Sequence, residues 1–237
     1  MPQLTHIKVI IATLKVETGL RIGGGDEGMH IGGVDNVIIK HPHTNEPYLP
    51  GSSVKGKMRS LLEWRSGAVQ SQVLSKGDYD NAPENQKEAI KHILQLFGMG
   101  GSDKLTEKEA VFFGPSRLAF WDCSLNTAWK ESALSDGLPL TEVKSENRID
   151  RIKGTAEHPR QTERIPAGAV FDFKLTFKVL SDDSNALEKT VLSGLKLLEL
   201  DGLGGSGSRG YGKIRFENLK LNEEDIQEEF DQIKPFA

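Results

Sequence analysis

The sequence predicts an α+β fold whose core follows the order strand, helix, strand, strand, helix, strand. Four segments rich in β-branched and aromatic residues predict the strands. Two segments between them repeat apolar residues at helical spacing. Long polar insertions interrupt this order, but no internal repeat and no linker rich in proline, glycine and serine marks a second domain. The order βαββαβ is that of a ferredoxin-like sandwich, which RNA-recognition motifs also use.

The first half of the core comes from three segments. Residues 6–17, HIKVIIATLKVE, are β-branched, partly alternate and predict the first strand. Residues 48–67 predict the first helix, in which Ser52 or Ser53 can cap the first turn. Residues 116–125, SRLAFWDCSL, predict the second strand.

The second half begins with the clearest strand, AVFDFKLTFKVL at residues 169–180. Apolar and polar residues alternate along it, so one side should face a core. Residues 186–202 predict an amphipathic helix, and residues 212–221 predict the last strand. The acidic tail at residues 221–236 is expected to form a solvated terminal helix.

We therefore expect residues 1–237 to form one domain with three insertions, at about residues 17–52, 67–115 and 126–168. An apolar run at residues 34–40 suggests one arm of a hairpin in the first insertion. A helix is expected at residues 84–98 in the second, with Gly98 as its C-cap. Insertions on a compact scaffold are common places for partner contacts and chemistry.

Composition limits the class of protein. An apolar content of 37% and a charged content of 27% are ordinary for a soluble globular chain. The single cysteine, Cys123, fits a reducing cytoplasm, and neither a signal peptide nor a membrane-spanning run is expected. The net charge of −4 still permits RNA binding, because phosphates respond to local basic stretches within a Debye length of about 8–10 Å.

A glycine-rich loop at residues 201–216, DGLGGSGSRGYGKIRF, contains six glycines and matches G-x-G-x-x-G in two registers. A dinucleotide site needs strand, loop and helix in that order, whereas this loop lies between a helix and a strand. A phosphate-binding P-loop would need Ser or Thr at the position of Ile214. Two interpretations remain: a tight connection, or bare backbone that approaches an anionic partner, with Arg209 as a further donor.

Two other basic motifs leave alternatives open. The helix start PGSSVKGKMRS combines free N–H groups with positive charge, which favours an anion site, but it equally fits a capped helix with a solvated basic face. The third insertion interleaves cations with isoleucines and fits a hairpin that wedges into RNA or contacts a neighbouring subunit. Its residues of interest are Arg148, Ile149, Arg151, Ile152, Lys153, Arg160 and Arg164.

Three polar residues of the first insertion are, on their own, weak evidence for a functional site. Asp35 lies on a glycine-flanked loop, where it can brace its own turn or help to bind a metal ion. His41 and His43 are expected at the surface, because the chain lacks the paired-ligand motifs of a structural zinc site.

The glycine-rich loop GLGGSGSRGYGKIRF resembles the signature loop of the RAMP (repeat-associated mysterious protein) superfamily of CRISPR systems. Together with LRIGGGDEGMHIGGVDNVIIKHPHTNEPYLPGSSVKGKMRSLLEWRSG, LFGMGG and NRIDRIKGTAEHPRQTERIPAGAVFDFKL, it makes nearly the whole chain similar to the backbone RAMP subunit of the type III-A (Csm) effector complex.

This resemblance implies a ferredoxin-like palm with a protruding thumb, whose copies stack as a filament along guide (CRISPR) RNA beside other Csm-complex subunits. It also implies a metal-dependent endoribonuclease that cuts complementary target RNA at regular intervals. The implied metal is Mg²⁺, with Mn²⁺ as an alternative. The implied catalytic and metal-binding residue is Asp35, with Asp26, Glu27 and His30 as lesser candidates. The implied RNA-binding residues are Ser53, Lys55, Arg59, Arg151, Lys153, Gly205, Gly207 and Arg209.

Two other functions stay open at this point. The chain could be a structural RNA-binding scaffold whose chemistry is supplied by another subunit. Asp35 distinguishes this scaffold from an endoribonuclease. It could also be a metal-independent RAMP nuclease that processes guide RNA with a histidine. In either case, recognition should be of RNA backbone and shape, because the strands lack the aromatic pattern that stacks bases.

Overall fold

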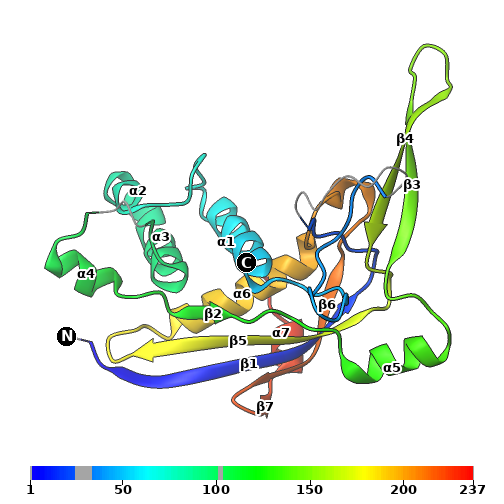
Figure 1. The fold of residues 1–237 in the computed structure, drawn as a ribbon. Coiled ribbons are helices and arrows are strands. Elements are labelled where there is room, and N and C mark those ends of the chain that lie inside the picture. Colours follow the sequence, from blue (N-terminus) through cyan, green and yellow to red (C-terminus); the bar gives the residue numbers. More distant parts are fainter. Residues whose placement is uncertain (1, 25–33, 101–103, 237) are drawn as a thin grey trace.

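A computed structural model describes residues 2–24, 34–100 and 104–236 (Figure 1). Its main sheet has the order β2-β5-β1-β6-β7, in which β1 is antiparallel to both β5 and β6. The first and third core strands are therefore central, as a ferredoxin-like sandwich requires, and the predicted fold class is confirmed. The strands are β1 (Leu4–Val16), β2 (Leu118–Phe120), β5 (Val170–Leu180), β6 (Ile214–Leu221) and β7 (Glu224–Asp225).

Helices α1 (Gly51–Ser66) and α6 (Ala186–Asp201) cover one face of this sheet (Figure 1). They approach closely, since a Cβ atom built on Gly194 of α6 would lie 2.4 Å from Cε of Met58. The alternation predicted for β5 holds, because Phe171, Phe173, Leu175 and Phe177 are buried beneath the helices. The Phe173 ring meets Phe216 of β6 edge-on at 5.0 Å, which joins the two strands through the core.

The second and third insertions contain more helix than the sequence predicted. Only α3 (Glu84–Phe97) was expected, whereas α2 (Lys76–Asn81), α4 (Glu107–Phe113) and α5 (Thr127–Ser135) were not. Capping boxes begin two of these short helices, with Ser75 paired to Asp78 in α2 and Thr106 paired to Glu109 in α4. The S-x-x-D and T-x-x-E spacings therefore carried a usable local signal.

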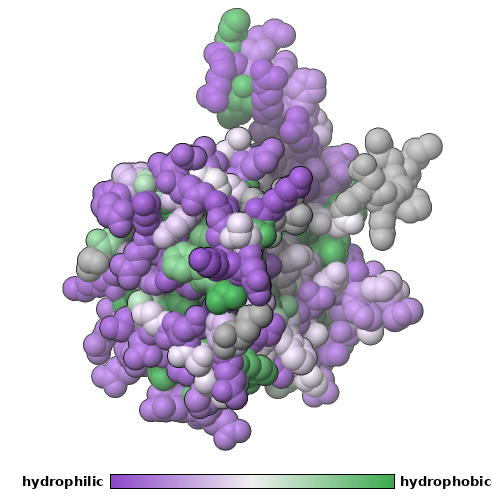
Figure 2. Space-filling model, turned by 90° about the vertical axis from the view of Figure 1, so that its left-hand side faces the viewer, coloured by the Kyte–Doolittle hydropathy of each residue, from purple (hydrophilic) through white to green (hydrophobic). Residues whose placement is uncertain are grey.

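The third insertion also forms the expected hairpin, which we call the thumb hairpin: β3 (Glu142–Ile149) and β4 (Ala156–Arg164). It stands clear of the body in Figures 1 and 2, largely hydrophilic with apolar patches toward its end. Asp150 organises the turn by accepting the N–H groups of Ile152 and Lys153 at 2.8 Å each. These backbone hydrogen bonds lower the pKa of Asp150. The tip thus presents an ordered Ile152 that is 96% exposed.

Two local expectations hold only in part, and a third is wrong. The run at residues 34–40 forms no regular strand and makes isolated bridges to three segments, through Gly23, Thr162 and Pro47. The antiparallel bridge between Gly23 and Ile38 is the part of the expected hairpin that is present. The expected strand at residues 116–125 is regular only in β2, after which the chain makes single bridges at Cys123 and Leu125.

The third concerns the start of α1. Neither Ser52 nor Ser53 caps the helix; Pro50 occupies the N-cap position. The Gly51 N–H instead donates to the Asp122 carboxylate at 2.7 Å.

The acidic tail is anchored rather than solvated throughout. It forms the short helix α7 (Gln227–Asp231), whose Phe230 is fully buried. The Phe230 ring packs edge-on against Phe216 at 6.2 Å. An apolar residue within an acidic segment therefore fixes the tail to the core. Among the described residues, no helix is both long and apolar enough to cross a membrane.

Cys123 is expected to be unreactive in the folded protein. Its side chain is fully buried, and burial, followed by the charge of Asp122, raises the pKa of its thiol to about 12. Since the thiolate is the reactive form and an ordinary cysteine has a pKa near ~8.5, a disulfide reagent at about pH 8 should label only unfolded chains. Rapid stoichiometric labelling without denaturant would contradict this burial.

Candidate nucleic-acid interface

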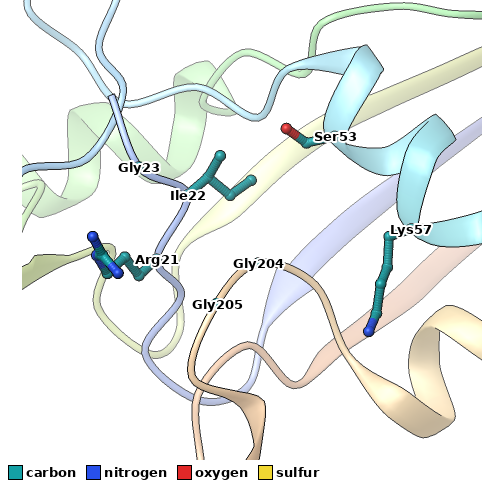
Figure 3. Close-up of a pocket in the computed structure, with 7 residues that line it drawn as sticks. All are labelled: Arg21, Ile22, Gly23, Ser53, Lys57, Gly204 and Gly205. Atoms are coloured by element: carbon teal, nitrogen blue, oxygen red, sulfur yellow. The ribbon is translucent and has the colours of Figure 1, made fainter. Parts of the chain in front are cut away.

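The start of α1, the glycine-rich loop and the segment that follows β1 meet around one pocket of about 350 Å³ (Figure 3). Ser53 and Lys57 reach it from α1, and the backbone of Gly204 and Gly205 lies opposite. Its lining residues are Arg21, Ile22, Gly23, Ser53, Lys57, Gly204 and Gly205. The structure therefore brings two predicted RNA-binding residues, Ser53 and Gly205, to one place. Sequence reasoning missed Arg21, which lies in the glycine-rich first insertion.

The glycines of the loop serve two different purposes. Gly204 and Gly212 have φ angles of +77° and +75°, and a Cβ atom on them would lie 2.3 and 2.0 Å from backbone oxygens of Arg21 and Leu203. Both glycines are thus needed for close packing of the loop itself. Gly207 differs, since nothing lies within 4 Å of where its Cβ would be. The loop is a tight connection at its ends and exposes bare backbone at its centre.

The loop is fastened to the base of the thumb hairpin through Glu146. The buried Tyr211 hydroxyl donates to this carboxylate at 2.7 Å, and Arg209 lies 3.5 Å from its other oxygen. The hydrogen bond from Tyr211 lowers the pKa of Glu146, against the effect of burial, and the charges of Arg209 and Lys144 add to it. Arg209 remains mostly exposed and also donates to the Ser206 hydroxyl.

The cations of α1 do not share one environment. Lys55 is partly exposed and has no ion-pair partner among the residues the structure describes. Lys57 lines the pocket and pairs with Asp201 at 2.5 Å.

Arg59 lies inside the protein, only 9% exposed, contrary to its expected place on an RNA surface. Its guanidinium donates to the Glu63 carboxylate at 2.7 Å and to the carbonyls of Gly98 and Leu74 at 3.0 Å each. Arg59 therefore anchors the second insertion to α1, and these donors are already used.

Asp35 lies at the base of the thumb hairpin rather than only within its own turn. Its Oδ2 accepts the N–H of Gln161 in β4 at 2.8 Å, and its side chain is exposed. The neighbouring Asn36 is held on both sides, donating its N–H to Gln161 O and accepting the N–H of Glu163. The hairpin thus fixes the backbone and one carboxylate oxygen of this segment.

A buried carboxylate that sequence reasoning missed completes this attachment. Glu163 accepts hydrogen bonds from the Ile38 N–H, the Lys40 ammonium and the Thr141 hydroxyl at 3.1, 2.5 and 2.9 Å. Burial alone raises the pKa of Glu163, but these hydrogen bonds, that from Lys40 foremost, leave it lowered overall. Glu163 consequently holds residues 38–40 against the hairpin.

Of the metal ligands predicted from the sequence, Asp35 is the one that lies within the described residues. There, no group of three or more His, Cys, Asp or Glu side chains could hold a metal ion. Asp26, Glu27 and His30 lie outside the described residues. One Asp35 oxygen accepts the Gln161 N–H, so the carboxylate is oriented and fits a cation whose other ligands come from RNA phosphate and water.

The expected thumb contacts are at the surface but away from the pocket. Arg151 and Lys153 lie in the exposed turn between β3 and β4, and neither lines the pocket. Lys153 is 4.0 Å from both Asp150 and Glu157, so its charge is partly offset. The structure therefore separates a basic tip from the site at the base.

Replacing Lys55 and Lys57 with alanine is expected to weaken binding of all RNA sequences alike, because both are cations near the start of α1 and phosphate contacts carry no sequence information. Each lost phosphate contact should reduce the salt slope of single-strand binding by about 0.7. The control is Lys178→Ala in β5, which removes one positive charge from the sheet and none from α1. Fluorescence anisotropy over a salt series gives both affinity and slope. Loss confined to certain sequences would contradict a backbone-binding surface.

The sheet order, the thumb hairpin and the pocket between α1 and the glycine-rich loop together define a ferredoxin-like protein with a protruding hairpin. A family model of the RAMP superfamily matches residues 13–215. The CRISPR system Cms endoribonuclease Csm3 of Streptococcus thermophilus is 42% identical over 212 residues, covering 88% of this chain and 86% of the relative. That of Methanothermobacter thermautotrophicus is 37% identical over 234 residues, covering 92% and 87%. The chain therefore belongs to the RAMP superfamily and, within it, to the Csm3 family.

Solved structures agree with this assignment. A Csm3–Csm4 subcomplex of the type III-A CRISPR-Cas interference complex contains a chain with a TM-score of 0.54 and 26% identity, covering 92% of this chain and 80% of the other. A type III-B Cmr-beta complex bound to cognate target RNA gives a TM-score of 0.56 at 16% identity, covering 91% and 60%. The second likeness is one of fold alone.

Proposed function

We propose that this chain is the guide-RNA-binding endoribonuclease subunit of a type III-A CRISPR effector complex, and that it cuts target RNA paired to the guide. The names of its Csm3 relatives support the activity. The structural observation that carries the proposal is the convergence of Ser53, Lys57 and the Gly204–Gly205 backbone on one pocket, with Arg21 reaching from that pocket to the Asp35 segment. An RNA backbone held there would lie near an oriented carboxylate.

Asp35 is the proposed catalytic residue. Its carboxylate would help to activate an RNA 2′-hydroxyl for in-line attack on the adjacent phosphate, while the Gln161 N–H holds one oxygen in place. A divalent cation, Mg²⁺ or Mn²⁺, would when bound neutralise charge on that phosphate. Asp35 would provide one ligand, and phosphate oxygens and water the rest. Attack by the 2′-hydroxyl leaves a cyclic phosphate on the upstream product.

The proposed assembly is a filament of copies along the guide RNA in contact with other subunits. The solved relative that is paired with Csm4 supports contact with different subunits. An open head-to-tail contact grows with its template, so each copy would present its own Asp35 to the target. Cuts should then be evenly spaced, one for each copy.

A structural scaffold is the second candidate, favoured because the described residues include no group of three or more His, Cys, Asp or Glu side chains that could hold a metal ion. The deciding experiment loads the complex with guide RNA and adds labelled complementary RNA, with Mg²⁺ or with EDTA. Evenly spaced, Mg²⁺-dependent products that disappear when the target has deoxyribose at the cut positions support the enzyme. A bound but intact target supports the scaffold, and cleavage that persists in EDTA supports a metal-independent RAMP nuclease.

A further inference from the structure

Arg21 joins the glycine-rich loop to the segment that carries Asp35. Its backbone carbonyl accepts the N–H of Gly205 at 2.9 Å. Its side chain extends the other way, pointing away from Ser53 and Lys57 in Figure 3. There its Nη2 donates to Asn36 Oδ1 at 3.1 Å. One residue therefore contacts both parts of the proposed site.

One buried donor of the Arg21 guanidinium, its Nε, has no hydrogen-bond partner among the described residues. A buried donor without a partner costs free energy, so such groups usually have a specific role. The fork of an arginine matches a phosphate group, and this side chain borders a pocket lined by a second cation, Lys57. A phosphate oxygen of bound RNA is the acceptor that this geometry suits.

The other end of the contact is rigid. The backbone of Asn36 is held by Gln161 and Glu163 of β4, and Asp35 precedes it directly. A side chain that holds the Asn36 amide therefore limits the movement of Asp35 relative to the glycine-rich loop. Since a misplacement of about 1 Å can cost a reaction ~100-fold, such a link bears on the cleavage rate.

We propose that Arg21 is a positioning residue for the cleavage reaction: its Nε–H donates a hydrogen bond to an RNA phosphate oxygen while its Nη2 donates to Asn36 Oδ1, so that binding of the RNA backbone sets the place of Asp35. The inference rests on the proposed function. It assigns to Arg21 a requirement for the guanidinium fork and not merely for a positive charge, because an ammonium cannot make both contacts in this fixed geometry.

The test compares Arg21→Lys, Arg21→Ala, Asn36→Ala and the double variant Arg21→Ala/Asn36→Ala in guide-loaded protein. Target affinity, single-turnover cleavage at saturating target and thermal unfolding are measured for each. Arg21→Lys should bind target nearly as well as wild type yet cleave it about 100-fold more slowly. Asn36→Ala should slow cleavage without weakening binding. The double variant should cleave no more slowly than Arg21→Ala, because both changes break one link.

Three results would overturn the proposal, and two of them concern cleavage alone: cleavage at the wild-type rate by Arg21→Lys, or rate losses in the double variant that multiply as for independent sites. Similar losses of unfolding temperature, target affinity and cleavage rate in both Arg21 variants would also overturn it, because Arg21 would then only stabilise the fold. Failure of the proposed function looks different, since wild type itself would then bind target without cutting it. That outcome rejects both proposals, whereas an active wild type with insensitive variants rejects only this one.

Discussion

Replacing Asp35 with asparagine is expected to reduce target cleavage by about 10²–10⁴-fold, the usual contribution of a group that moves a proton in the transition state. The amide oxygen of asparagine can still accept the Gln161 N–H, so the segment should stay in place. Only the negative charge and its capacity to bind a cation are lost. Single-turnover cleavage of labelled target by guide-loaded protein measures the effect.

Asp35→Ala serves as the matched control, because it removes both the charge and the hydrogen bond to Gln161. Both variants should keep their target affinity and unfold within about 0.5 kcal/mol of wild type, as is usual for an exposed site. Equal loss of cleavage in the two would assign the effect to the charge. Cleavage by Asp35→Asn at the wild-type rate, with target fully bound, would remove Asp35 from the chemistry and support the scaffold.

Replacing Arg59 with alanine is expected to lower the free energy of unfolding by about 3–5 kcal/mol, the range for breaking a buried ion pair. The cause is that Glu63 would be left buried without its cation, while the carbonyls of Gly98 and Leu74 would lose their donors. Urea denaturation monitored by circular dichroism measures the change. RNA affinity, corrected for the folded fraction, should be unchanged.

Lys55→Ala provides the opposite control on the same face of α1, one turn earlier. It should leave stability unchanged and weaken RNA binding, since Lys55 is partly exposed and makes no ion pair among the described residues. The two variants together distinguish a structural cation from an RNA-binding one. Wild-type stability combined with lost RNA affinity in Arg59→Ala would return Arg59 to the RNA surface.

The different environments of Lys55 and Arg59 show what a local sequence pattern cannot predict. Their spacing of four residues places them on one face of α1, and a local pattern treats them alike. The second insertion, however, folds over the later turn, where Leu74 and Gly98 approach the Arg59 guanidinium. Whether a helix face is solvated depends on such distant segments. No pattern within the helix could reveal that burial.

The glycine-rich loop shows a similar division. Its composition correctly indicated close backbone approach, but which glycines were required for packing and which were exposed could not be read from spacing. Gly204 and Gly212 pack against Arg21 and Leu203, whereas Gly207 has open space around it. The acidic tail was likewise misjudged, because its charge concealed the single aromatic anchor, Phe230.

By itself, the sequence determined the order of the core elements, the ferredoxin-like class and the basic thumb hairpin. The core elements follow from periodicity and turn residues, which act over a few neighbouring positions, and the alternation in β5 is the clearest case. The thumb was implied by the resemblance to RAMP proteins. Only the tertiary structure decided that Arg21 contacts Asn36 and Gly205, that Gln161 holds Asp35, and that Arg59 is buried. Those contacts join residues as much as 184 positions apart, as between Arg21 and Gly205. Their formation depends on how separate elements pack, a property that local residue patterns do not contain.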